Sequence, residues 1–143
     1  MCGVEAPRER RFARGGESPA MARIRTLVNR LVPVGASLDE MLDAVAAHVG
    51  RPVRVRDAEL DESTSGVWVR TADADWIVVR ATNAERRLHV IGHEVGHIVL
   101  GHDDQLARSH YDDPRERDAE LFGTLLVQRM RRARLGSASA ALR

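Results

Sequence analysis

The feature that most constrains how this chain folds is a pair of histidines four residues apart, His93 and His97, inside an otherwise apolar segment. An α-helix turns once every 3.6 residues, so these two side chains lie about 40° apart on one helical face. A buried stripe nearly opposite to them has helical spacing and consists of Ile91, Val95, Ile98 and Val99. We therefore predict a helix with the core on one side and a functional site on the other.

Two glycines, Gly92 and Gly96, fall on a third face of the same predicted helix. Each glycine costs a helix about 1 kcal/mol relative to alanine. Neither is needed for a turn at its position. We therefore expect the backbone of another element to pack closely against this face.

Glu94 completes the pattern His93-Glu94-x-x-His97. In this pattern the two histidines bind one zinc ion and the glutamate acts as general base of a peptidase. Glu94 lies about 100° from His93 around the helix, which suits holding a water molecule better than binding the metal. The alternative is a chance match on a helix with two core histidines. The apolar stripe on the opposite face favours the metal site.

A catalytic zinc ion takes three protein ligands, so one more is needed. Leu100 and Asp103 stand where one class of zinc peptidase has Gly and His, which excludes that class. On a continued helix His102 would lie about 180° from His93 and could not reach the same ion. His89 lies one turn before His93, and we expect it to form a wall of the site.

A carboxylate from the last predicted helix is the remaining choice. Asp113-Pro114 opens this helix, with proline at the first helical position. Glu116 and Glu120 share the flank that faces the core, whereas Asp118 points away. Asp113 and Glu116 also fit a capping box. Helical spacing alone leaves both Glu116 and Glu120 as possible third ligands.

The rest of the chain predicts a small mixed fold. We expect one helix over 21–31 and a second from the Ser37 cap to Gly50. The helix of the two histidines is expected to begin at a cap at Thr82 or Asn83, and the last helix at residue 114. A strand is expected over 51–56, and a hairpin is expected to pair 67–70 with 76–80. Residues 1–20 are predicted to be a disordered basic arm, 21–135 one domain and 136–143 a flexible tail, with Met21 as an alternative start.

Composition narrows the class of protein. The 143 residues suit one domain. The formal net charge of +1 favours binding to neither nucleic acid nor a membrane surface. Cys2 is the only cysteine, so an internal disulfide and a cysteine-based metal site are excluded. Neither a secretory h-region nor an apolar run of about 18 residues is present, so we expect a cytoplasmic protein.

Two motifs of this chain can be compared with a known family. The first runs from His93 to His102 and reads His-Glu-Val-Gly-His-Ile-Val-Leu-Gly-His, and the second is Glu116-Arg-Asp-Ala-Glu-Leu-Phe-Gly-Thr-Leu-Leu126. Together they resemble the ImmA/IrrE family of metallopeptidases. The resemblance covers roughly residues 50–128. This chain departs from the usual family pattern at Asp118, Glu120, Gly123, Val127-Gln128 and His89. The second motif, at its distance from the first, is the more specific part.

The resemblance implies a small α+β, zincin-like metallopeptidase domain with the His93–His97 helix at its centre. It implies that Zn2+ is bound by His93, His97 and Glu116, with Glu94 as the catalytic base. It further implies a protease that cleaves a regulatory partner, such as a helix-turn-helix repressor. The alternatives are a regulator without proteolytic activity and a toxin-like partner of an antitoxin. An oxyanion-stabilising group is not identified, and His110 and Tyr111 are candidates.

Overall fold

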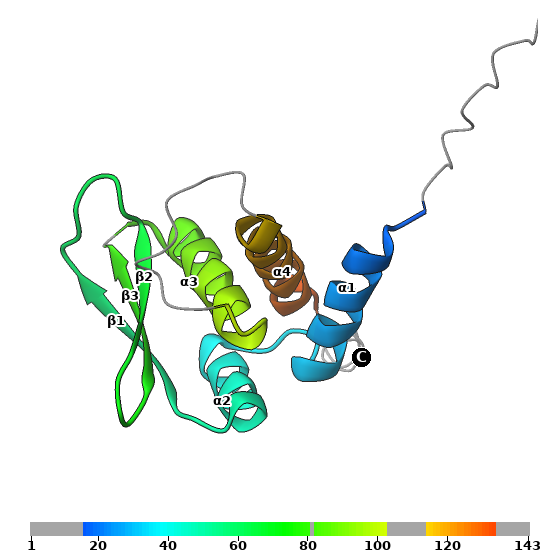
Figure 1. The fold of residues 1–143 in the computed structure, drawn as a ribbon, viewed down its shortest axis with the longest axis horizontal. Helices are drawn as coiled ribbons and strands as arrows, with labels where there is room; N and C mark the ends of the chain where they lie inside the picture. The colour runs from blue at the N-terminus through cyan, green and yellow to red at the C-terminus, as the bar shows by residue number, and fades with distance from the viewer. Residues whose placement is uncertain (1–15, 81, 103–113, 134–143) are drawn as a thin grey trace, which may run out of the picture.

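The computed structural model describes residues 16–80, 82–102 and 114–133, and these residues form a small mixed α+β fold (Figure 1). The elements are α1 (Pro19–Leu31), α2 (Leu38–Val49), β1 (Val53–Ala58), β2 (Gly66–Arg70), β3 (Asp75–Arg80), α3 (Ala84–Val99) and α4 (Pro114–Arg131). The predicted combination of helices with a small sheet is confirmed. Within the described part of the chain, none of the helices combines the length and apolar character needed to cross a bilayer.

The three strands form one sheet in the order β1-β3-β2. The predicted hairpin is present, because β2 pairs with β3 in antiparallel register, with Trp68 opposite Ile77. The first strand begins two residues later than predicted and pairs with β3 in parallel. Alternation along β3 buries Ile77 and Val79, and α3 packs against both β2 and β3.

A buried carboxylate holds the start of β3. Asp75 is fully buried and accepts hydrogen bonds from Arg70 at 2.8 and 3.2 Å, while Arg51 Nε lies 3.5 Å from the same side chain. Burial raises the pKa of Asp75, but the hydrogen bond from Arg70 and the charges of Arg70 and Arg51 together bring it below its ordinary value. This ion pair joins the two strands of the hairpin at the end near their turn.

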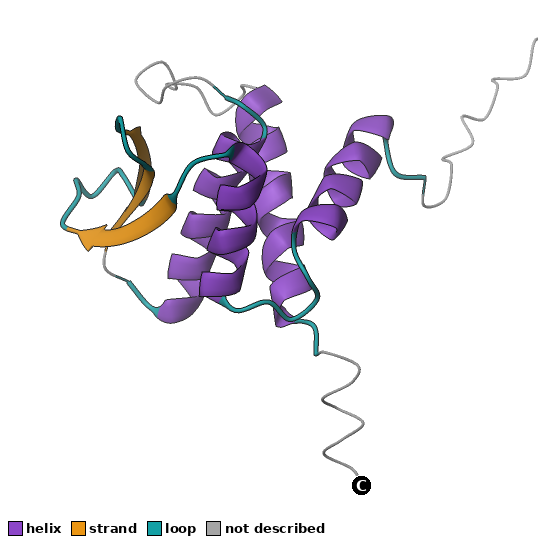
Figure 2. Ribbon diagram, turned by 90° about the horizontal axis from the view of Figure 1, so that it is seen from below, coloured by secondary structure: helices purple, strands orange, loops and turns teal. Residues whose placement is uncertain are grey.

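Helices α3 and α4 pack closely because glycines face each other across their interface. A Cβ at Gly123 would lie 2.8 Å from the backbone nitrogen of His93, and a Cβ at Gly92 would lie 3.2 Å from the carbonyl oxygen of Gly123. Gly96 packs in the same way against Ala119. The prediction that Gly92 and Gly96 admit another backbone is therefore confirmed. Figure 1 shows that α3 lies between the sheet and α4, and Figure 2 shows the strands on one side of the helices.

The first two helices complete the core. Helix α1 begins before the predicted residue 21, because Ser18 caps it by accepting a hydrogen bond from the Met21 backbone and Pro19 occupies its first turn. Helix α2 has the predicted capping box of Ser37 and Glu40 and ends at Gly50, which has a φ of 76°. Helix α1 packs against α4, and α2 packs against α3 and β1.

Candidate metal centre

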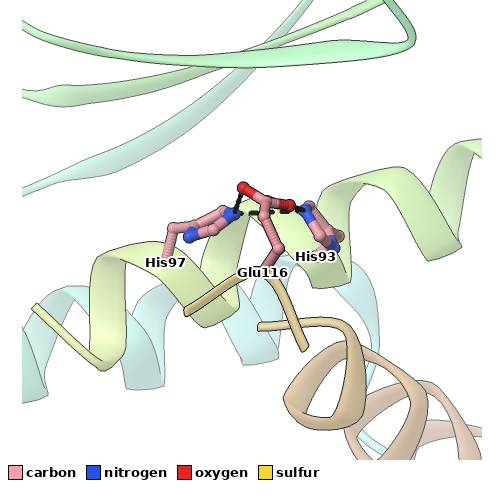
Figure 3. Close-up of side chains that lie close together, drawn as sticks. All are labelled: His93, His97 and Glu116. Carbon is pink, nitrogen blue, oxygen red and sulfur yellow. Dashed lines mark hydrogen bonds and ion pairs between the residues drawn. The ribbon is translucent and has the colours of Figure 1, made fainter. Parts of the chain in front are cut away.

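Three side chains from α3 and α4 converge on one point (Figure 3). The Nε2 atoms of His93 and His97 lie 3.1 Å apart. The carboxylate of Glu116 meets both rings, with Oε2 3.0 Å from His93 Nε2 and Oε1 3.1 Å from His97 Nε2. These three residues form a group that could hold a metal ion, since one ligand atom from each lies within 4.8 Å of the others.

The local sequence explains why each of these three side chains lies at the point of convergence. Asn83 caps α3 by accepting a hydrogen bond from the Arg86 backbone at 2.9 Å, so the helix begins at Ala84, more than two turns before His93. Helical spacing then places His93 and His97 on one face. Glu116 lies in the first turn of α4, which begins at Pro114. The close glycine packing of α3 and α4 brings this turn within reach of both rings.

The structure distinguishes Glu116 from Glu120, which the sequence left open. Glu120 also contacts His93, but its Oε2 lies 2.8 Å from Nδ1, the ring nitrogen that does not face the cluster. Its side chain is 71% exposed, against 25% for Glu116. Glu116 therefore lies at the point of convergence, and Glu120 supports one ring from outside. Asp118 is not part of the group.

The contact with Glu120 gives the direction of one hydrogen bond of His93. An ionised carboxylate only accepts hydrogen bonds, so Nδ1 of His93 donates to Glu120. The other ring nitrogen, Nε2, faces the carboxylate of Glu116. A cation bound between them would take the lone pair of Nε2 and an oxygen of Glu116 as ligands. Two imidazole nitrogens and a carboxylate are also the donor set of a catalytic zinc site.

The spacing of the donor atoms suits zinc. Tetrahedral coordination with bonds of about 2.0–2.1 Å separates two ligand atoms by about 3.3 Å. The observed separations of 3.0 to 3.1 Å are slightly shorter. The two distances to Glu116 involve different carboxylate oxygens, and small rotations of the side chains would bring one oxygen to the tetrahedral spacing from both nitrogens. The residues present therefore fit a zinc ion.

Other predicted residues occupy different places. Glu94 is buried, with 5% of its surface exposed, and its Cγ lies 3.6 Å from where a Cβ at Gly66 would stand. It therefore packs against the start of β2 and is not one of the three converging residues. His89 is exposed. The candidate oxyanion groups His110 and Tyr111 lie outside the described residues.

Sequence reasoning missed the position of His102, because it continued the helix through this residue. Helix α3 ends at Val99, and Gly101 takes the left-handed conformation with a φ of 70°. The chain reverses there, and His102 Nδ1 lies 2.8 Å from His97 Nδ1. A glycine directly after the apolar run is a known signal for such a helix end.

Comparison of the chain with protein-family models, with curated proteins and with solved structures finds no match.

Proposed function

We propose that this protein is a zinc-dependent endopeptidase of the ImmA/IrrE type with a small zincin-like fold. The observation that carries the proposal is the convergence of His93, His97 and Glu116 on one point, with Glu94 directly following the first histidine on α3. The two histidines come from the motif, and the glutamate comes from a second helix. This is the donor set that a hydrolytic zinc site uses.

His93, His97 and Glu116 would hold the ion. Zinc, when bound, supplies Lewis-acid activation of a water molecule and of the scissile peptide carbonyl. Glu94 would accept the proton of that water and pass it to the leaving amine as general acid. The low exposure of Glu94 would keep competing water from its carboxylate.

The resemblance to the family supports a regulatory protein as substrate, such as a helix-turn-helix repressor. A protease acts catalytically, so a small amount of it would remove an excess of its substrate. A regulator that acts only by binding, or a toxin neutralised by its antitoxin, would be needed in stoichiometric amounts. This difference in stoichiometry separates the proposal from its alternatives.

The test is to co-express the protein with a candidate helix-turn-helix regulator and with a reporter under that regulator. Wild type, Glu94→Gln and the control Glu62→Gln, an exposed carboxylate in the loop before β2, are compared at matched levels. The regulator is followed by immunoblot. We expect cleavage with wild type and control, and a loss of about 10²–10⁴-fold with Glu94→Gln at unchanged zinc content. If Glu94→Gln induces the reporter as strongly as wild type while the regulator stays intact, the protein acts by binding and the peptidase proposal is wrong.

A further inference from the structure

We propose that His102 is a positioning residue for His97, holding its ring so that Nε2 faces the metal. The inference rests on the metal centre of the proposed function. His102 is a histidine outside the predicted motif, and it would act by accepting a hydrogen bond from Nδ1 of His97. It would not touch the metal or the substrate.

The backbone brings His102 to this place by a specific helix end. The backbone nitrogen of His102 donates to the carbonyl oxygen of His97 at 3.0 Å, and that of Gly101 donates to Ile98 at 3.2 Å. These two bonds with a left-handed glycine form a Schellman motif. The motif ties His102 to the very residue whose ring it contacts. The end of α3 therefore fixes the backbone position of His102 beside His97.

The side-chain contact has the geometry of a hydrogen bond. The two Nδ1 atoms lie 2.8 Å apart, and the rings meet edge to face with an interplanar angle of 62°. Stacked rings would instead lie nearly parallel. When His97 donates through Nδ1, its lone pair resides on Nε2, the nitrogen that faces His93 and Glu116. With His97 as the donor and His102 as the acceptor, the contact favours the tautomer of His97 that can bind a metal through Nε2.

The two metal-facing histidines are supported in parallel ways. His93 has the carboxylate of Glu120 at its outer nitrogen, and His97 has the imidazole of His102. The His97 side chain is fully buried, whereas that of His93 is 23% exposed. Bulk water does not reach the His97 ring, so solvent is a poor substitute for His102 there.

A role for His102 as a metal ligand fits the geometry less well. Its ring faces Nδ1 of His97, whereas the converging atoms lie at Nε2, on the other side of the same ring. Among the described residues, the group that could hold a metal contains His93, His97 and Glu116 without His102. His102 therefore supports a ligand and does not replace one.

The experiment measures Zn2+ affinity of the full chain by competition with a chromogenic chelator. The variants are His102→Ala, His102→Asn and the control His48→Ala, an exposed histidine at the end of α2. Loss of such an outer hydrogen bond typically weakens metal binding about 10–100-fold, which we expect for His102→Ala. Asparagine places an amide oxygen near the position of Nδ1, so His102→Asn is expected to restore most of the affinity. His48→Ala should match wild type.

A second readout is the absorption spectrum of the Co2+-substituted protein, which reports the geometry of the ligands. We expect His102→Ala to shift the visible bands and His102→Asn to return them. Unchanged zinc affinity and spectrum in His102→Ala would overturn this inference while leaving the metal centre intact. Equal losses in His102→Ala and His102→Asn, with altered bands in both, would make His102 a ligand. A wild-type protein that binds no zinc would overturn the inference and the metal centre together.

Discussion

A Cβ on Gly96 would lie 2.8 Å from the carbonyl oxygen of Ala119, closer than real Cβ atoms approach an oxygen. Gly96 immediately precedes His97 on α3, and Ala119 lies one turn after Glu116 on α4. This point of close helix packing is therefore adjacent to the candidate ligands on both helices. This contact sets the distance across which Glu116 reaches the two rings.

Gly96→Ala should therefore destabilise the protein although alanine favours a helix. The new methyl group meets backbone atoms that cannot rotate away, and such overpacking costs about 1–3 kcal/mol. Urea unfolding followed by circular dichroism measures the loss. Gly16→Ala is the control, because a Cβ there has nothing within 4 Å, and its change should stay within about 0.5 kcal/mol. A Gly96→Ala protein as stable as wild type would show that the helices can separate freely.

Purified protein should hold about one zinc ion per chain. His97→Ala should abolish this binding, because it removes one of the three converging donors and its ring is fully buried. Metal analysis after dialysis measures the stoichiometry. His89→Ala removes an exposed histidine one turn before His93 and should keep the zinc. Full occupancy in His97→Ala would refute the assignment of this centre.

Glu116 and Glu120 should differ in the size of their effects on zinc binding. Glu116→Gln removes a charged donor that meets both rings. Glu120→Gln changes only the hydrogen-bond partner of Nδ1 of His93. We expect it to lower the zinc affinity by at most about 10–100-fold. Isothermal titration with Zn2+ gives both affinities, with Asp118→Asn as the neighbouring control. A larger loss for Glu120→Gln would exchange the roles of the two carboxylates.

The buried ion pair of Asp75 should make stability depend on pH in acid. The pKa of Asp75 lies below its ordinary value of 3.8 in the folded state, so its stabilisation is fully present well above that pH and is lost as the pH falls through the lower folded value. The difference in unfolding free energy between wild type and Asp75→Asn should thus be constant at pH 6–8 and shrink below about pH 4. Asp73→Asn, an exposed residue of the same hairpin, should show no such trend.

The sequence by itself determined the features that depend on neighbouring residues. The spacing of His93 and His97 places them on one helical face, and the apolar stripe opposite includes Ile91 and Val95, which are fully buried. The capping box of Ser37 and Glu40 and the glycine positions follow equally local rules, so the ends of α2 and the packing face of α3 were predicted. Helix geometry is set by the backbone, and it is the same wherever the helix lies.

Only the tertiary structure decided which partners meet across elements. Glu116 and Glu120 are one turn apart on the same flank of α4, and the position and tilt of α4 against α3 direct one to Nε2 and the other to Nδ1 of His93. The reversal at Gly101 differs, because it is a local helix end that the glycine signals, and it brings His102 back to His97. The roles of the two glutamates depend on how two helices that are separate in the chain pack together, and residue spacing along the chain does not encode that packing.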